Sequence, residues 1–163
     1  MKKAVGFTIL LLVIASCTAT AQTKKAPNQN MVEAEFAAWN SHDADKVAAC
    51  YTSDADYEDV AFGLTVHGKA ELRKMATDFF TAVPDLKLEA VSTWMANGHG
   101  GAEWIFTGTD VGLFKTGKKF SVRGASLFET KGNKFSRNKD FYDSASIMRQ
   151  VGVLPEAKAA ETQ

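Results

Sequence analysis

Asn138-Lys139-Asp140-Phe141-Tyr142-Asp143 is the most informative stretch of the sequence, because it has the pattern of a strand that carries an acid at mid-length. Successive side chains of a strand point to opposite faces, so Asn138, Asp140 and Tyr142 share one face. An acid among aromatic residues either faces solvent or lies in a pocket, where burial raises its pKa and makes it a proton carrier. We favour the pocket for Asp140. Asp143 precedes a predicted short helix, where an Asp is a common N-cap.

The strand before this stretch pairs with it through a predicted turn at Gly132-Asn133. A simple two-residue loop places Ala125 opposite Asp140, with Arg123 diagonal to it and able to form an ion pair. A connection longer by one residue, with a bulge, places Ser126 opposite Asp140 instead. The register stays open, because a slip of one residue exchanges the two faces. The other face of the last strand is predicted to reach solvent, and it carries Phe135, Arg137, Lys139 and Phe141.

Hydrophobic periodicity over the rest of the chain predicts helices first and strands afterwards. The predicted helices are Asn30 to Asn40, Ala44 to Tyr51 (capped by Asp43) and Lys69 to Ala82, and the predicted strands are Asp54 to Asp59, Leu86 to Ala90, Glu103 to Gly108, Phe120 to Glu129 and Phe135 to Tyr142. This order is typical of an α+β fold rather than alternating α/β. We expect a curved antiparallel sheet packed on three helices, with a small-molecule pocket at its open end.

Three further residues are candidates for binding a ligand. Tyr57 and Asp59 share one face of the first strand, so both can reach the mouth of a pocket. His67 directly precedes a helix and either hydrogen-bonds a ligand or organises its loop. The three histidines of the chain have unrelated spacings, and no Cys-x-x-Cys pair is present, so no metal site is predicted.

The N-terminus has the pattern of an export signal. Lys2 and Lys3 precede an apolar run that is too short to be a typical membrane span, which predicts a signal peptide over residues 1–21. Alternatively, Ile14 to Cys17 resembles a lipobox, in which Cys17 is lipidated and anchors the protein to a membrane. We therefore expect a bacterial periplasmic or secreted protein, or a lipoprotein. Residues 22–29 are a predicted tether, 30–153 one domain, and 154–163 a disordered tail.

Charge and cysteine content argue against a nucleic-acid partner and against an intrachain disulfide. Loss of residues 1–21 leaves 17 Lys and Arg against 19 Asp and Glu, a net charge of −2, so no nucleic-acid partner is expected. Cys50 is then the only cysteine expected in the domain, which leaves no partner for an intrachain disulfide. We interpret it as a small buried apolar residue.

The order and spacing of several short motifs resemble a known family. The motifs are Trp39-Asn40-Ser41-His42-Asp43-Ala44-Asp45, Tyr57-Glu58-Asp59, His67-Gly68-Lys69, Pro84-Asp85-Leu86, Glu103-Trp104, Gly108-Thr109, Thr116-Gly117-Lys118, Asp140-Phe141-Tyr142-Asp143 and Arg149-Gln150-Val151-Gly152. Over about residues 30–153 the chain resembles the SnoaL-like polyketide cyclase (ester cyclase) family of the nuclear transport factor 2-like superfamily. The resemblance implies a cone-shaped α+β fold with an apolar cavity. It also implies that an Asp on the last strand, matched by Asp140, is the acid/base of an aldol closure without a cofactor. Characterised cyclases carry a His where this chain has Ser126, and the family often has one at the position of Asp110.

Two functions follow as hypotheses. The first is a cofactor-independent enzyme acting on a small hydrophobic carbonyl compound or ester, in which Asp140 moves a proton and Tyr57, Asn138 or Tyr142 holds the developing oxyanion. The second is a non-catalytic envelope protein that binds a small ligand or a partner in the same cavity. A homodimer formed through the outer sheet face is also expected from the resemblance. The predicted substrate-binding residues are Trp39, Tyr57, Asp59, His67, Ser126, Asn138 and Tyr142.

Overall fold

A computed structural model describes residues 29–156 of the 163-residue chain. The predicted signal peptide, Cys17, nearly all of the tether and residues 157–163 of the tail lie outside the described residues. The described elements are, in order, α1 (Gln29–Asn40), α2 (Ala44–Ala49), β1 (Tyr51–Asp59), β2 (Leu64–His67), α3 (Gly68–Ala82), β3 (Lys87–Ala96), β4 (His99–Thr109), β5 (Lys119–Lys131), β6 (Lys134–Tyr142) and α4 (Ser144–Gln150). None of these helices is long and apolar enough to cross a membrane.

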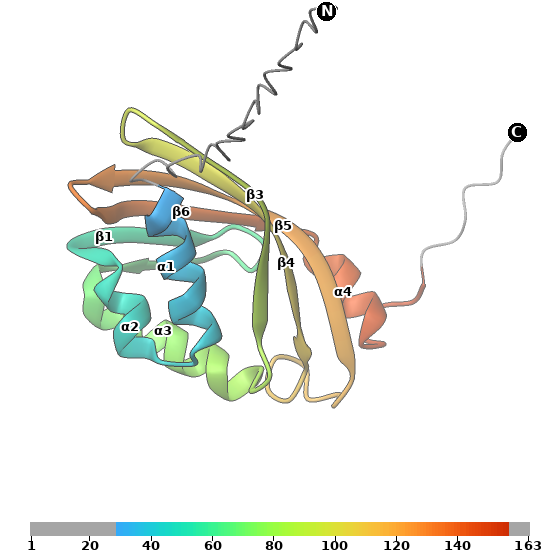
Figure 1. The fold of residues 1–163 in the computed structure, drawn as a ribbon. Helices are drawn as coiled ribbons and strands as arrows, with labels where there is room; N and C mark the ends of the chain where they lie inside the picture. Colours follow the sequence, from blue (N-terminus) through green and yellow to red (C-terminus); the bar gives the residue numbers. More distant parts are fainter. Residues whose placement is uncertain (1–28, 157–163) are drawn as a thin grey trace, which may run out of the picture.

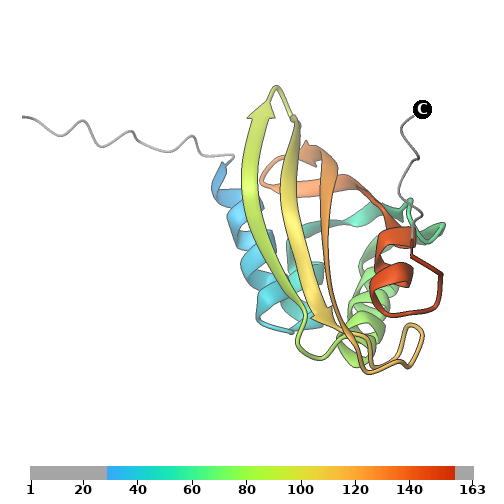
Figure 2. The ribbon, with the colours of Figure 1, turned by 90° about the vertical axis from the view of Figure 1, so that its right-hand side faces the viewer.

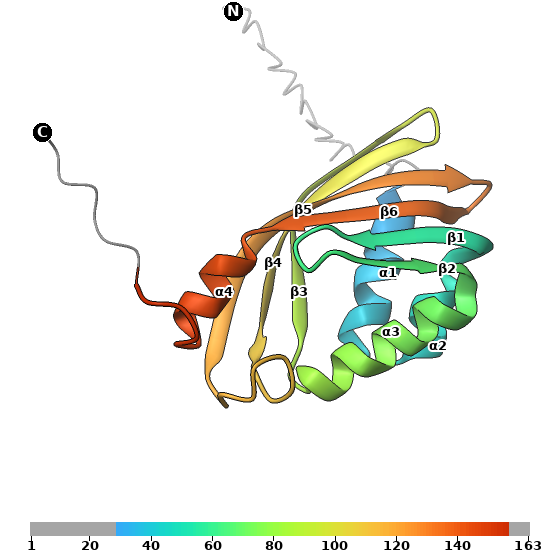
Figure 3. The same cartoon turned by 180° about the vertical axis from the view of Figure 1, so that it is seen from behind.

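The six strands form one curved, open sheet in the order β2-β1-β6-β5-β4-β3. Strands β3 to β6 pair antiparallel, as the predicted hairpins require. Strand β1 then lies parallel to β6, so the first and last strands of the chain meet in the middle of the sheet (Figure 3). This parallel pair was not predicted, because the sequence pattern of a strand does not say which distant strand it joins. The α+β prediction is confirmed.

Helices α1, α2 and α3 lie on the concave side of the sheet, and α4 lies at the far end of β5 (Figure 1). Figure 2 shows β3, β4 and β5 side by side, with α1 and α3 behind them. The buried core lies between these two layers. The predicted cap of α2 is confirmed, because the side chain of Asp43 accepts hydrogen bonds from the backbone N–H groups of Asp45 and Lys46. Asp143 caps α4 in the same way, and its Oδ1 accepts from the N–H of Ser146 at 2.9 Å.

Two predicted boundaries in the N-terminal half are wrong. The second helix ends at Ala49, and Tyr51 begins β1 instead of closing the helix. Tyr51 is fully buried and packs on Phe135 of β6, so tertiary packing overrides its helical spacing. A short strand, β2, was not predicted at all, and it forms because residues 64–67 pair antiparallel with the end of β1.

The β5–β6 hairpin combines features of both predicted registers. Its turn has two residues, Gly132 and Asn133, since Lys131 pairs with Lys134. The register then shifts, because Thr130 pairs with Phe135 and Glu129 with Arg137, which leaves Ser136 without a partner on β5. This bulge places Ser126 opposite Asp140.

The bulge also corrects one predicted face. Phe135 was expected on the solvent face with Arg137, but it is 1% exposed and packs on Phe128 in the core. Arg123 does not pair with Asp140, and its guanidinium lies 3.3 Å from the carboxylate of Glu103.

Gly124 gives Trp104 its place beneath the sheet. A Cβ at position 124 would lie 2.2 to 2.7 Å from three carbons of the Trp104 ring, which is far inside van der Waals contact. The six-membered ring of Trp104 therefore occupies the space that a Cβ at position 124 would need. Its Nε1 donates to the Oγ of Ser126 at 2.8 Å, so the absence of a side chain at position 124 positions a polar contact two residues away.

Replacing Gly124 with Ala is expected to displace Trp104 and lower the free energy of unfolding by about 1–3 kcal/mol, the usual cost of overpacking a core. Urea unfolding measures the loss, and the indole N–H signal of Trp104 in NMR spectra reports the weakened bond to Ser126. Ala125→Ser, at the neighbouring exposed position, is the control. Equal stability of Gly124→Ala and the wild type would contradict this account.

Candidate active site

A narrow cavity opens between the concave face of the sheet and helices α1 and α3. Its volume is about 50 Å³, enough for a few water-sized groups or the polar end of a ligand. Most of its lining is aromatic or aliphatic, and three carboxyl groups interrupt this apolar wall. The lining residues are Glu35, Phe36, Trp39, Tyr57, Asp59, Phe79, Leu86, Leu88, Trp104, Phe106, Ser126, Asp140 and Tyr142.

Asp140 lines this cavity from β6 and accepts hydrogen bonds from three side chains. Ser126 Oγ donates to its Oδ1 at 2.5 Å, and Asn138 Nδ2 donates to the same oxygen at 2.8 Å. The hydroxyl of Tyr57 makes a short hydrogen bond to Oδ2. Burial raises the pKa of Asp140 above its ordinary value, the three donors oppose that rise, and the nearby charge of Asp59 adds to it. Asp140 is therefore a half-buried, poorly solvated carboxyl group with a fixed orientation.

The serine beside Asp140 is itself held in place. Because Trp104 Nε1 donates to Ser126 Oγ, the hydroxyl proton of Ser126 is free to point at Asp140. Indole N–H is only a donor, so this direction is fixed by the chemistry of the ring. The bulge at Ser136 and the bare backbone at Gly124 both contribute to this arrangement.

Asp59 is the register neighbour of Asp140 on the parallel strand β1. It is 3% exposed, and its Oδ2 accepts the hydroxyl of Tyr142 at 2.7 Å. Its Oδ1 accepts the backbone N–H of Phe62 at 3.1 Å. Burial raises the pKa of Asp59, while the bond from Tyr142 lowers it. The tyrosine hydroxyls of positions 57 and 142 therefore both donate to carboxylates across the β1–β6 pair.

Glu35 on α1 completes the group of carboxyls, and it was not among the site residues predicted from the sequence. Its Oε1 accepts the indole N–H of Trp39 at 2.7 Å and the hydroxyl of Tyr51 at 3.0 Å. Burial, followed by the charge of Asp140, raises the pKa of Glu35 to about 8. The available signal was the i, i+4 spacing of an acid and Trp39 on an otherwise apolar helix stripe.

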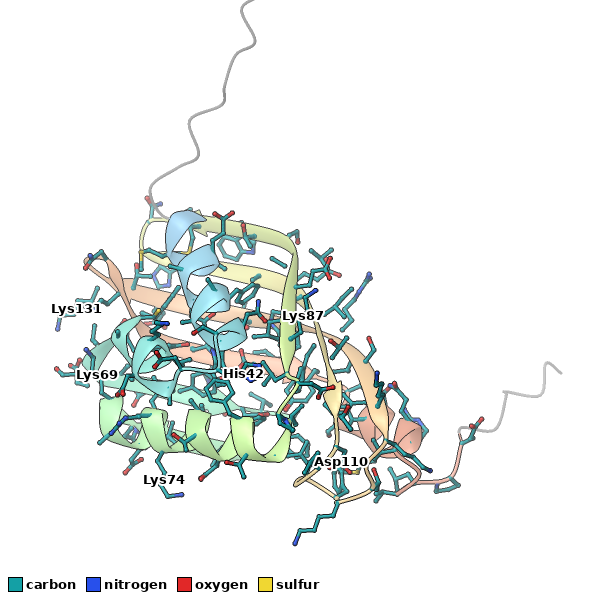
Figure 4. The ribbon with its side chains drawn as sticks, turned by 60° about the horizontal axis from the view of Figure 1, so that its bottom comes forward. His42, Lys69, Lys74, Lys87, Asp110 and Lys131 are labelled. Atoms are coloured by element: carbon teal, nitrogen blue, oxygen red, sulfur yellow. The ribbon has the colours of Figure 1, made fainter. Side chains whose placement is uncertain are left out.

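No Lys, Arg or His is among the described residues that line the cavity. The labelled Lys74 and Lys131 extend from the outside of the domain (Figure 4). In the described part of the chain, no three His, Cys, Asp or Glu side chains are grouped closely enough to hold a metal ion. The three acids of the cavity therefore have no cationic side chain beside them in the described lining, which favours neutral over anionic ligands.

The sequence of this domain matches a known protein family. The sequence profile of the SnoaL-like domain matches residues 32–138. The chain belongs to the SnoaL-like domain family. A search of curated proteins finds no match.

Solved structures show that the fold of this SnoaL-like domain is shared widely. A hypothetical protein with a ketosteroid isomerase-like fold from Catenulispora acidiphila, in complex with trimethylamine, is 23% identical with a TM-score of 0.70, over 75% of this chain and 92% of that one. A proposed SnoaL-like polyketide cyclase from Jannaschia is 15% identical with a TM-score of 0.70, over 79% and 94%. AclR, a proposed hydroxylase from Streptomyces galilaeus, is 19% identical with a TM-score of 0.69, over 80% and 84%. At these identities the likeness shows the fold alone.

Most of the residues predicted to bind substrate meet at the cavity of this SnoaL-like domain. The lining includes Trp39, Tyr57, Asp59, Ser126 and Tyr142 together with Asp140. Asn138 lies behind the lining and reaches the cavity only through Asp140.

His67 is not brought to the cavity. It lies exposed at the junction of β2 and α3. Its Nδ1 is 2.7 Å from Oδ1 of Asp56 on β1, and its backbone N–H donates to Glu71 at 2.9 Å. Of its two predicted roles, the structure fits the organisation of the loop. Asp110, where the resemblance places a His, is buried and accepts the backbone N–H groups of Phe114 and Thr116, so it holds the β4–β5 loop.

Cys50 is half-buried at the end of α2, and burial raises the pKa of its thiol to about 11. The thiolate is the nucleophilic form of cysteine, so a thiol with this pKa is unreactive near neutral pH. This agrees with its interpretation as a packing residue.

Glu35→Gln is expected to change how stability depends on pH. Because the folded state holds the Glu35 proton up to about pH 8 and the unfolded chain only to its ordinary 4.5, the folded state binds more protons between these values. The free energy of unfolding therefore falls as pH rises through this window, by up to ~5 kcal/mol for the full shift. Glu35→Gln removes this contribution and keeps an acceptor for Trp39 and Tyr51.

Urea unfolding of both proteins across this window tests the prediction. Burial raises the pKa of Asp59 and Asp140 as well, so they add a decline of the same sign to both curves. The difference between the two slopes is what reports Glu35. Parallel curves would show that Glu35 titrates normally.

Proposed function

We propose that this SnoaL-like domain is a cofactor-independent acid/base enzyme that acts on a small, neutral, hydrophobic carbonyl compound or ester, with Asp140 as the proton carrier. The observation that carries the proposal is the placement of Asp140, a half-buried, poorly solvated carboxyl group with a fixed orientation on the wall of an aromatic cavity. A carboxylate with a raised pKa binds a proton more tightly than a solvated carboxylate does, and it is therefore a stronger general base.

The hydrogen bonds of Asp140 leave it room for one proton. A carboxylate has about four lone-pair positions. Ser126 and Asn138 occupy two on Oδ1, and Tyr57 occupies one on Oδ2. The remaining position on Oδ2 is the one we assign to the substrate proton.

The reaction that fits this arrangement is removal of a hydrogen next to a carbonyl group. The C–H bond breaks, its proton moves to Oδ2 of Asp140, and its electron pair moves toward the carbonyl oxygen to form an enolate. Return of the proton to another carbon gives an isomerisation, and attack of the enolate on a second carbonyl group gives a cyclisation. One protein of similar structure is a proposed SnoaL-like polyketide cyclase, which supports this class of reaction.

A non-catalytic binding protein is the second candidate. Three donors at Asp140 also suit a carboxylate that is permanently ionised and serves only to organise the wall. The narrow cavity would then hold a small ligand without chemistry. Turnover distinguishes the two functions.

Export and dimerisation remain part of the proposal. Export rests on the pattern of residues 1–21 alone. A homodimer would use the outer face of the sheet, where strand register places the exposed Trp94 beside Gly101 and Leu127, and Phe141 is exposed one row away. An apolar patch of this kind is a common protein–protein contact.

The wild-type protein is expected to exchange the α-hydrogens of cyclohexanone for deuterium in D₂O, and Asp140→Asn to lose this activity by at least ~100-fold, because an amide cannot take the proton. Proton NMR follows the exchange, and thermal unfolding checks that the variant folds. Asp78→Asn, which changes an exposed carboxylate paired with Lys74, is the matched control. Undiminished exchange by Asp140→Asn would rule out Asp140 as the base. Binding of cyclohexanone by the wild type without exchange would favour the binding protein.

A further inference from the structure

The enolate that Asp140 would generate needs a hydrogen-bond donor at its oxygen, and the donors expected from the sequence are already engaged. The hydroxyl of Tyr57 donates to Asp140, and that of Tyr142 donates to Asp59. The side-chain N–H group of Asn138 donates to Asp140 as well, and Asn138 does not line the cavity. A different group is therefore required for this role.

Glu35 has a free oxygen at the cavity. Both of its hydrogen bonds, from Trp39 and Tyr51, go to Oε1. Oε2 has no hydrogen-bond partner among the described residues. The unpaired side-chain atoms that are closed off from solvent are Thr52 Oγ1 and Asn138 Oδ1. Oε2 of Glu35 is not one of them, so it is at least partly accessible. Since Glu35 lines the cavity and is only 4% exposed, the accessible part of Oε2 faces that space.

We propose that Glu35 is a second catalytic residue, a neutral carboxylic acid that donates from Oε2 to the carbonyl oxygen of the substrate while Asp140 takes the α-hydrogen. This inference rests on the proposed function, and it adds a residue that neither the sequence pattern nor the family resemblance identified.

The surroundings of Glu35 favour its neutral form. The groups that face it are the carboxyl of Asp140 on β6 and the hydroxyls of Tyr51 and Tyr57 on β1, and no cation is among them. The thiol of Cys50 also lies within electrostatic range. An anion at Glu35 would meet the anion at Asp140 in a poorly solvated space, which is costly. The raised pKa of Glu35 agrees with this geometry.

The proposed step keeps the total charge of the two catalytic groups at −1. Before it, Asp140 is ionised and Glu35 carries a proton. The α C–H bond breaks and its proton joins Asp140, while the O–H bond of Glu35 breaks and its proton joins the carbonyl oxygen. The product is a neutral enol, with Asp140 protonated and Glu35 ionised. One negative charge has moved across the cavity, so two ionised groups never face each other.

The same arrangement defines the class of substrate. A ketone or ester presents a neutral acceptor oxygen to Glu35 and a C–H group to Asp140. A carboxylate brings a further negative charge into a cavity that contains Asp59, Asp140 and Glu35 and no cation among its described lining residues. We therefore expect methyl levulinate to bind and exchange its α-hydrogens, and levulinate, which differs by its charge, to do neither.

The test compares Glu35→Gln with the wild type in the exchange assay over a range of pH. Glutamine keeps an acceptor for Trp39 and Tyr51 and places N–H where Oε2 was, but it has no proton to transfer. Exchange of cyclohexanone by the variant is expected to fall at least ~10-fold. Wild-type exchange should decline as pH rises through about 8, where Glu35 ionises, and the variant should lack this decline. Glu89→Gln, at an exposed position of β3, is the control.

A second readout needs no turnover. The carbonyl carbon of ¹³C-labelled cyclohexanone bound to the wild type should shift downfield near neutral pH, as expected for a hydrogen-bonded carbonyl, and this shift should disappear as Glu35 ionises. In Glu35→Gln it should not depend on pH over that range. If the wild type shows the pH-dependent carbonyl shift but exchanges no hydrogen, the proposed enzyme activity is overturned, while Glu35 remains the hydrogen-bond donor to the ligand. A wild-type shift independent of pH, an absence of binding, or full activity of Glu35→Gln would overturn the role of Glu35.

Discussion

Buried carboxyl groups must be matched by hydrogen-bond donors, and this requirement organises the interior of the domain. A carboxyl group taken out of water is costly unless it is hydrogen-bonded. Here the donors come mainly from aromatic side chains, whose rings form the cavity wall and whose polar atoms point at the acids. Tyr57, Tyr142 and Trp39 are examples, and each donates to a different carboxyl group. The wall and the acids therefore cannot be positioned independently.

Strand register is the geometric condition for this matching. The bulge at Ser136 advances β6 by one residue, so that Ser126 rather than Ala125 lies opposite Asp140. Without it, the inward row of β5 would present a methyl group to the acid, and Phe135 would leave the core. β-bulges often occur beside active sites, where they re-aim a side chain. In this domain the bulge shifts the pairing of the rest of β6 with β5 by one residue. Gly124 then leaves space for the indole ring that positions Ser126.

Local patterns allowed much of the fold to be predicted. Alternation placed Asp140 and Tyr142 on the inward face, and the N-cap at Asp143 followed from its place between a strand and a helix. Features that depend on distant contacts were missed. Strand β2 exists because it pairs with β1, and the parallel meeting of β1 with β6 joins opposite ends of the chain. Glu35 was missed for the same reason, because an acid on a helix is ordinarily solvated, and only the fold shows that this one faces Asp140.

The energetics of Glu35 separate a structural from a chemical role. A pKa raised from 4.5 to about 8 corresponds to roughly 5 kcal/mol between the two protonation states, a large quantity beside the 5–15 kcal/mol that typically stabilises a domain. Holding Trp39 and Tyr51 needs only an acceptor oxygen, which glutamine supplies without titrating. A carboxyl group at this position adds one property that glutamine lacks, a proton that can leave at moderate pH. Perturbed acids of this kind concentrate at functional sites. A structural role alone thus explains the acceptor oxygen of Glu35 but leaves its ionisable proton unexplained, whereas acid catalysis beside Asp140 uses both.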